Sequence, residues 1–250
     1  MTELEALFLL HTDLPREGPG SDEATREAIQ RLPAMPSSPR VIDLGCGPGK
    51  QSLVLADHFR STVTALDFHA PYLERLRQSA AAQGIIEFID TRHGRMEELE
   101  ELPGSVDLIW SEGAIYNVGF TAGLQLWRPL LRDAGCVVAS EATWFTDSPP
   151  EEIQAYWRDE YPAMTTIQGN IKHVVESGYD VLDHFRLPTS AWWDEYYTPL
   201  AERVAQLRVS DCIDSVLSDA LDEADREMEM HSKYSDDYGY IFYLMQKTSG

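Results

Sequence analysis

VIDLGCGPGK, residues 41–50, is the most informative part of this chain. A run of apolar residues ends in Gly45, Gly47 and Gly49, and a helix-like segment, residues 50–60, starts directly afterwards. Glycine is needed in such a turn because the chain bends sharply and approaches its ligand with no side chain in between. A buried strand, a glycine-rich turn and a helix in this order predict a site for a nucleotide-like cofactor.

The spacing of the glycines separates two kinds of cofactor. The dinucleotide pattern GxGxxG would place a glycine at position 50, which is Lys50 here, so the chain has GxGxG instead. Asp67 follows Gly47 by 20 residues, at a strand end where a carboxylate can accept hydrogen bonds from both ribose hydroxyls. An NAD-dependent reductase would need Tyr-x-x-x-Lys on a helix, but the match at Tyr243 and Lys247 lies in a strand-like segment. The spacing therefore favours a cofactor without a pyrophosphate.

Strand and helix patterns alternate along the chain from residue 40 onwards. Strands are expected at residues 41–45, 62–67, 86–90, 106–110 and 136–142, and further helices at residues 71–84 and 121–135. Pro71 near the first turn and Gly84 at the end are typical boundaries of the earlier helix. This alternation indicates right-handed βαβ units and a mostly parallel sheet.

After residue 145 the pattern changes. Ser148, with Glu151 three residues later, predicts a capping box for a helix over residues 151–161. Two further strands are expected at residues 179–188 and 238–247. A helical insertion lies between them, at about residues 190–235. We expect it to form either a cap over the active site or a dimer surface, the latter implying a homodimer.

These patterns together predict an α/β fold with one main domain. The Pro/Ser-rich segment LPAMPSSPR, residues 32–40, is typical of a linker. It divides a helical segment, residues 1–39, from a domain of residues 40–250. We expect a doubly wound, mostly parallel, seven-stranded sheet of Rossmann-like type. Residues 1–39 are called the arm below, and residues 190–235 the cap.

The composition restricts the partners of this protein. The 250 residues carry a formal net charge of -22, which repels nucleic-acid phosphates and anionic membranes. Cys46, Cys136 and Cys212 are widely spaced, so neither a disulfide framework nor a metal site is expected. No apolar run reaches a membrane-spanning length, and no basic leader precedes the first apolar residues. We therefore expect a cytoplasmic protein without nucleic-acid or membrane partners.

The motifs resemble those of class I S-adenosylmethionine-dependent methyltransferases. The resemblance covers roughly residues 16–145 and is closest to bacterial small-molecule enzymes with the segments EGPGS (17–21), WSEGAIYN (110–117) and SEATWF (140–145). It implies the Rossmann-like methyltransferase fold, S-adenosylmethionine as cofactor and a small molecule as methyl acceptor.

The resemblance also implies which residues bind the cofactor. Asp67 would hold the ribose, and Phe68 and Met96 would flank the adenine. Relatives often carry an acidic or small polar residue before Met96, but Arg95 can only donate, so the adenine contact would come from the backbone or from Glu97. The full expected set is Gly18, Pro19, Asp43, Gly45, Gly47, Gly49, Asp67, Phe68, Arg95, Met96 and Ser111.

The acceptor is expected at the carboxyl ends of the fourth and fifth strands. Methyl transfer from a sulfonium needs in-line geometry and a dry site, and a base only when the acceptor arrives protonated. Glu112 is the first catalytic candidate, either as a base or substrate anchor or, alternatively, as a ligand of the cofactor's amino group, and Tyr116 is the second. The expected acceptor-binding residues are Asn117, Glu141, Trp144, Trp193 and Tyr197.

Aromatic and acidic residues dominate these segments, and basic residues are scarce. Such a pocket favours an amine or a nitrogen heterocycle as acceptor. A neutral hydroxyl or thiol is the alternative acceptor, and a non-catalytic protein that binds S-adenosylmethionine is the alternative function. Several of the rings could instead belong to the core.

Overall fold

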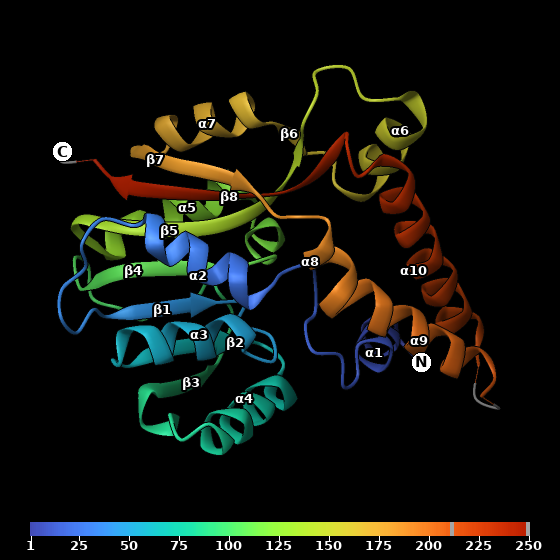
Figure 1. The fold of residues 1–250 in the computed structure, drawn as a ribbon, viewed down its shortest axis with the longest axis horizontal. Helices are drawn as coiled ribbons and strands as arrows, with labels where there is room; N and C mark the ends of the chain where they lie inside the picture. The colour runs from blue at the N-terminus through green and yellow to red at the C-terminus, as the bar shows by residue number, and fades with distance from the viewer. Residues whose placement is uncertain (211–212, 249–250) are drawn as a thin grey trace.

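The computed structural model describes residues 1–210 and 213–248, and its centre is a mixed β-sheet (Figure 1). The strands follow the order β3-β2-β1-β4-β5-β8-β7. Their bounds are β1 (Val41–Leu44), β2 (Val63–Asp67), β3 (Ile89–His93), β4 (Val106–Ser111), β5 (Leu131–Trp144), β7 (Tyr179–Arg186) and β8 (Tyr238–Lys247). The two-residue β6 (Thr165–Thr166) pairs with β5 beside this path.

Strands β1 to β5 are parallel, and only β8 runs antiparallel to its neighbours β5 and β7 among the described strands. The predicted fold class, a doubly wound and mostly parallel seven-stranded sheet, is therefore confirmed, with β6 as a short addition. The strand order reverses at β1, since β2 lies on one side of it and β4 on the other. In such sheets the ligand crevice opens at the carboxyl ends of the strands at this switch point.

Helices cover both faces of the sheet. Successive strand residues point to opposite faces, so Val41 belongs to one buried cluster and Ile42 to another. The first cluster includes α2 (Asp22–Arg31), α3 (Lys50–Phe59) and α4 (Ala70–Ala82), and the second includes α5 (Phe120–Trp127) and α7 (Ile167–Glu176).

The remaining helices gather at the end of the sheet to which the parallel strands point (Figure 1). They are α1 (Glu3–Leu10), α6 (Glu151–Glu160), α8 (Ser190–Trp192), the π-helix η4 (Trp193–Tyr197), α9 (Thr198–Arg208) and α10 (Ser215–Tyr234). Helix α10 buries Leu217, Leu221, Ala224 and Met228, a spacing that forms one apolar stripe along the helix. Helix α1 of the arm packs against α9 and α10 of the cap.

Three local predictions were wrong. The helix expected over residues 121–135 ends at Trp127, because Pro129 cannot continue the hydrogen-bond ladder; a 3-10 turn, η3 (Arg128–Leu130), follows, and β5 starts at Leu131. Ser148 does not cap α6, which begins after Pro150 with no side-chain cap. The third strand lies three residues later than expected, because Ile86–Phe88 forms the 3-10 turn η1.

Two further observations complete the description. Cys46 and Cys136 are buried and free, and Cys212 lies outside the described residues. Within residues 1–210 and 213–248, no helix combines the length and the apolar character needed to cross a membrane.

Candidate active site

A cavity of about 570 Å³ opens at the carboxyl ends of β1, β2 and β4. Its walls come from the arm, the turn after β1, the end of β2, the segment after β3, helix α6 and the cap. The sequence-predicted residues that line it are Gly18, Pro19, Gly45, Gly47, Asp67, Phe68, Arg95, Met96, Tyr116 and Asn117. Residues from five separate chain segments therefore meet at the topological switch point.

The turn after β1 has no room for side chains. Gly45 has a φ of 71°, and a Cβ there would lie 2.5 Å from the Cβ of Ala114 and 2.9 Å from Met96 Cε. Gly47 has a φ of 54°, and its Cβ would lie 3.3 Å from Glu17 Cγ. Both the backbone conformation and the space therefore require glycine, which leaves bare backbone facing the cavity.

Asp67 closes β2 beside this turn. Its carboxylate accepts hydrogen bonds from the backbone N–H of Gly47 (2.9 Å) and of His69 (2.8 Å). Burial raises the pKa of Asp67, and these two donors offset part of that rise. The carboxylate is thus fixed at the cavity wall with lone pairs left for a further donor, such as a ribose hydroxyl.

Glu17 in the arm faces the same turn, and sequence reasoning did not select it. The Tyr72 hydroxyl donates to one carboxylate oxygen, while the other, Oε1, is buried without a hydrogen-bond partner. Burial raises the pKa of Glu17 to about 7. A cationic ligand would compensate this carboxylate, so the glycine turn and Glu17 together fit the sulfonium and amino groups of S-adenosylmethionine.

Three residues predicted to bind the cofactor do not line the cavity. Asp43 lies fully buried beneath the turn, where it accepts from Ser52 Oγ, and burial raises its pKa to about 7. Ser111 donates to the Leu44 carbonyl (3.0 Å). Gly49 has a φ of 86°, and a Cβ there would lie 2.4 Å from Leu76 Cδ1, so this position sets how closely α3 and α4 pack.

The segment after β3 and helix α1 form the wall around the predicted adenine position. Phe68 is 49% exposed, and the ring of Phe8 from α1 stacks on His69 at 3.6 Å. Arg95 Nη2 lies 3.2 Å from a carboxylate oxygen of Glu97. Helix α1 adds Leu7, Phe8 and His11 to the lining, and no local sequence pattern connected these residues with the cofactor.

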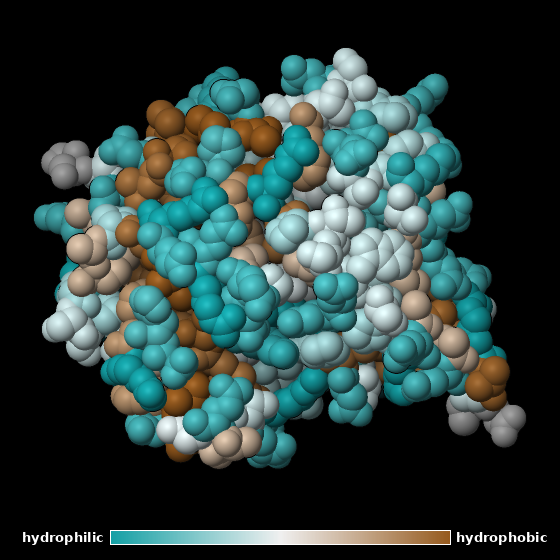
Figure 2. Space-filling model, in the orientation of Figure 1, coloured by the Kyte–Doolittle hydropathy of each residue, from teal (hydrophilic) through white to brown (hydrophobic). Residues whose placement is uncertain are grey.

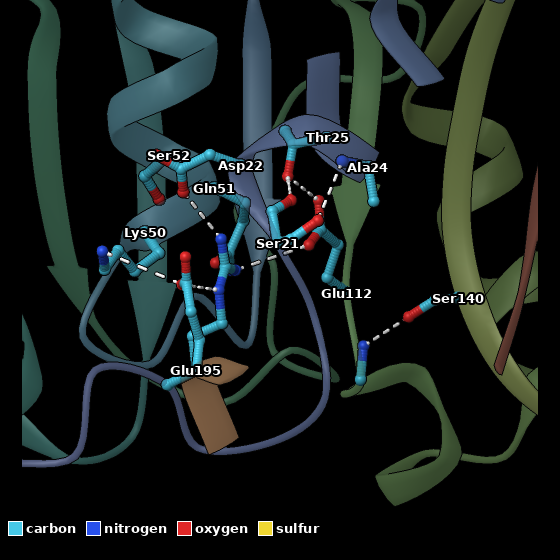
Figure 3. A network of polar contacts seen from close by, with 12 residues as sticks. Ser21, Asp22, Ala24, Thr25, Lys50, Gln51, Ser52, Glu112, Ser140 and Glu195 are labelled. Atoms are coloured by element: carbon cyan, nitrogen blue, oxygen red, sulfur yellow. Dashed lines mark hydrogen bonds and ion pairs between the residues drawn. The ribbon is translucent and has the colours of Figure 1, made fainter. Parts of the chain in front are cut away.

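Glu112, the first catalytic candidate, is 9% exposed and does not line the cavity. Trp110 Nε1 (2.8 Å) and Thr25 Oγ1 (2.7 Å) donate to its Oε1. Burial raises the pKa of Glu112, and the Arg16 guanidinium, 3.8 Å away, lowers it again in part. The carboxylate is therefore engaged by Thr25 and Arg16 of the arm and by Trp110 of β4, and Figure 3 shows Glu112 beside Thr25.

Arg16 is the centre of that network. It is 4% exposed and lies among carboxylates from three elements. Its Nη2 lies 2.8 Å from Asp22 of α2, and its Nε lies 2.8 Å from Glu195 of the cap. Together with the contact to Glu112, which directly follows β4, these contacts connect the arm, the end of the sheet and the cap through one cation.

The part of the cavity away from the glycine turn is aromatic and acidic. The lining side chains there are Tyr116, Tyr156, Trp157, Glu160, Tyr161, Tyr196, Glu227 and Tyr240. Among the described lining residues, Arg95 is the one Arg or Lys, and Glu97 pairs with it. This arrangement suits a cationic or neutral guest and disfavours an anionic one.

Four residues predicted to bind the acceptor stand behind this wall. Glu141 is 2% exposed, and burial raises its pKa to about 8. Trp144 packs edge-on against Tyr238, and Trp193 packs edge-on against Tyr197. Tyr197 is fully buried and donates to Glu227 (2.8 Å). Asn117 does line the cavity, but its amide donates to the Ala114 carbonyl (3.0 Å).

Comparisons with known proteins agree with this geometry. Residues 41–135 match the family described as "Methyltransferase domain". The trans-aconitate 2-methyltransferase of Paracidovorax citrulli is 29% identical over 74% of this chain and 72% of its own length. The dimethylglycine N-methyltransferase of Parasynechococcus marenigrum is 29% identical over 48% of this chain, which spans 44% of that relative.

The whole fold has a counterpart among solved structures. A SAM-dependent methyltransferase from Geobacter sulfurreducens, crystallised with S-adenosyl-L-homocysteine, superposes with a TM-score of 0.83 at 16% identity and covers 98% of both chains. The matched family domain contains β1, the glycine turn and Asp67 described above, and together with the neighbours crystallised with S-adenosyl-L-homocysteine it confirms the predicted cofactor. Residues 41–135 therefore form a methyltransferase domain, and the relatives and the solved structures together support a class I S-adenosylmethionine-dependent methyltransferase.

Proposed function

We propose that this enzyme transfers the methyl group of S-adenosylmethionine to the nitrogen of a small amine or nitrogen heterocycle. The observation that carries this proposal is the composition of the acceptor part of the cavity. Glu160 and Glu227 lie there among six aromatic side chains, while Arg95 belongs to the opposite wall and is paired. Each aromatic face can contribute about 0.5–2 kcal/mol to holding a cation.

The cofactor part of the cavity supports a definite orientation of the cofactor. We assign the ribose to Asp67, the methionine portion to the backbone at Gly45 and Gly47, and the adenine to the wall containing Phe68 and Met96. When bound, S-adenosylmethionine supplies a methyl group on a sulfonium, and the acceptor's lone pair forms the new bond while the electrons of the S–C bond pass to sulfur.

The arm and the cap supply the remaining condition, a site closed to water. We propose that both act as a lid, because Gly18 and Pro19 of the arm and Tyr196 and Glu227 of the cap all line the cavity. Excluding water keeps the nucleophile desolvated and aligned during transfer.

The names of the relatives point to two kinds of acceptor, an aconitate and an amine. An aconitate-like anion would need cations at the acceptor wall, and that wall presents Glu160 and Glu227 instead. An amine gains from the same carboxylates and rings. The charge of the wall therefore favours nitrogen as the methylated atom.

The test combines calorimetry with turnover on a panel of amines, phenols, thiols and carboxylic acids. We expect methylated amines, and we expect Asp67→Ala to weaken S-adenosylmethionine binding by about 1.5–3 kcal/mol, the range for hydrogen bonds to a charged group. Asp57→Ala, an exposed carboxylate on α3, is the matched control and should bind normally. Methylation of a carboxylic acid with no amine turned over would overturn the proposal.

A further inference from the structure

Glu227 is the one carboxylate that the cap contributes to the described cavity lining. It lies on α10, among residues far in sequence from the glycine turn. Its Oε1 accepts a hydrogen bond from the Tyr197 hydroxyl at 2.8 Å. No Lys, Arg or His within residues 1–210 and 213–248 forms an ion pair with it, whereas the buried Glu112 has Arg16 beside it.

The π-helix η4 explains how Tyr197 reaches this position. Residues 190–208 wind continuously, but Trp193–Tyr197 adopt π-helical turns directly before α9. Pro199 in the first turn of α9 has no N–H for the carbonyl four residues earlier, which disfavours regular α-helix here. The wider turn directs both Tyr196 and Tyr197 inward, with exposed fractions of 5% and 0%.

Phenol rings from several elements border the Glu227 carboxylate. Burial, and after it the charge of Glu227, raises the pKa of Tyr116 and of Tyr196. Burial, Tyr116 and Glu227 together raise the pKa of Tyr240. Tyr116, Tyr196 and Tyr240 all line the cavity, so the carboxylate and the rings face the same space. A carboxylate among aromatic faces is the chemistry that recognises an ammonium group.

We propose that Glu227 binds the ammonium group of the acceptor and takes up its proton before methyl transfer. This inference rests on the proposed function. The proton passes from the acceptor nitrogen to a carboxylate oxygen of Glu227, and the nitrogen keeps the electron pair. That pair forms the N–CH₃ bond as the sulfonium becomes a thioether, and Glu227 afterwards releases its proton to water.

The electrostatic surroundings suit this role. The pKa of Glu227 is raised to about 7, mainly by burial and to a smaller extent by the carboxylates of Glu223 on α10 and Glu160 on α6, while the hydrogen bond from Tyr197 offsets part of the rise. A base is most effective when its pKa lies near the working pH. The other titratable groups that face Glu227 are the phenols of Tyr116, Tyr156, Tyr196, Tyr238 and Tyr240.

The first experiment compares Glu227→Gln with the matched control Glu229→Gln, an exposed carboxylate on the same helix. For Glu227→Gln we expect at least a tenfold loss of kcat/KM for amines and loss of the rise in kcat/KM with pH near 7. Calorimetry with the S-adenosylhomocysteine complex should show weakened amine binding and unchanged affinity for S-adenosylhomocysteine. The control should match the wild type in every respect.

A second variant, Tyr197→Phe, keeps the carboxylate and removes its donor. Because the Tyr197 hydroxyl lowers the pKa of Glu227, its loss should move the pH–rate rise to higher pH. Amine turnover with an unchanged amine affinity and pH profile in Glu227→Gln would overturn the role of Glu227 and leave the proposed function standing. Absence of any amine turnover in the wild type would remove the proposed function itself.

Discussion

Gly45, Gly47 and Gly49 share a positive φ, yet their surroundings differ. Gly45 and Gly47 line the cavity, while Gly49 faces Leu76 of α4. Sequence spacing predicts that all three glycines belong to the turn, since each needs the left-handed region of backbone space. It cannot tell which of them a cofactor touches, because the packing of α3 on α4 determines what lies beside position 49.

Gly49→Ala should therefore be a stability variant. Gly84 also has a positive φ (68°), but a Cβ there would meet nothing within 4 Å. We expect Gly84→Ala to lose about 1–2 kcal/mol from the left-handed backbone alone. Gly49→Ala should lose about 1–3 kcal/mol more because its methyl group overlaps Leu76. Urea unfolding measures both, and equal losses would show that Leu76 moves away freely.

At the scale of elements, the sequence is sufficient to predict the core strands, but it says little about which elements pack beside one another. The alternation of apolar residues predicts β1, β2, β4 and β8 closely, since buried strands depend on local pattern. It cannot predict that Glu227 of α10 faces the same cavity as Gly45 and Gly47, because α10 and the glycine turn lie more than 100 residues apart in the chain. The sequence shows that Trp193–Tyr197 is rich in aromatic residues, but it does not show that this segment is π-helical. It also does not show that Tyr196 lines the cavity while Tyr197 lies behind the cavity wall.

Arg16 joins three elements, so its loss should affect all of them. Arg16→Gln leaves Glu112 buried without its cation and leaves Glu195 of the cap with Lys50, 3.8 Å away, as its ion-pair partner. Removing one partner of a buried ion pair costs about 3–5 kcal/mol, and we expect an effect of that size on unfolding. Arg26→Gln is the control, because Arg26 is 53% exposed and its ion pairs on α2 contribute little.

Limited proteolysis gives a second measurement for Arg16→Gln. If Arg16 holds the arm against the cap, cleavage in the arm should become faster while the sheet stays protected. Unchanged stability together with unchanged cleavage would show that the α1 contacts with α9 and α10 hold the arm without Arg16.

At the scale of the whole molecule, the acidic residues form two separate groups. Hydrophilic residues cover most of the face shown in Figure 2, in keeping with a net charge of -22. A second group of carboxyls is buried in and under the cavity, and burial raises their pKa to about 7 or 8. These are Glu17, Asp43, Glu141 and Glu227. The pKa values of this second group place its change of charge near neutral pH.

The free enzyme should lose stability as the pH rises from 6.5 to 8. The folded pKa values of these carboxyls lie above the unfolded values of about 4. The stability that these groups contribute is therefore fully present below pH 4 and is lost as the pH rises through the folded pKa values. Because the folded state then holds more protons than the unfolded state near pH 7, the free energy of unfolding falls as the pH rises through this range. His231, whose pKa burial lowers to about 4, acts in the opposite direction, but only below about pH 6.5.

Urea unfolding at several pH values, repeated in high salt, separates the buried carboxyls from the acidic surface. Salt screens surface repulsion, but it does not supply the protons that the buried groups lose. The slope should therefore persist in high salt, become shallower in Glu227→Gln and remain unchanged in Glu229→Gln. Saturating S-adenosylmethionine should also reduce it, because a bound cation next to Glu17 favours the ionised carboxylate. A slope that vanishes in high salt would instead assign the pH dependence to the surface.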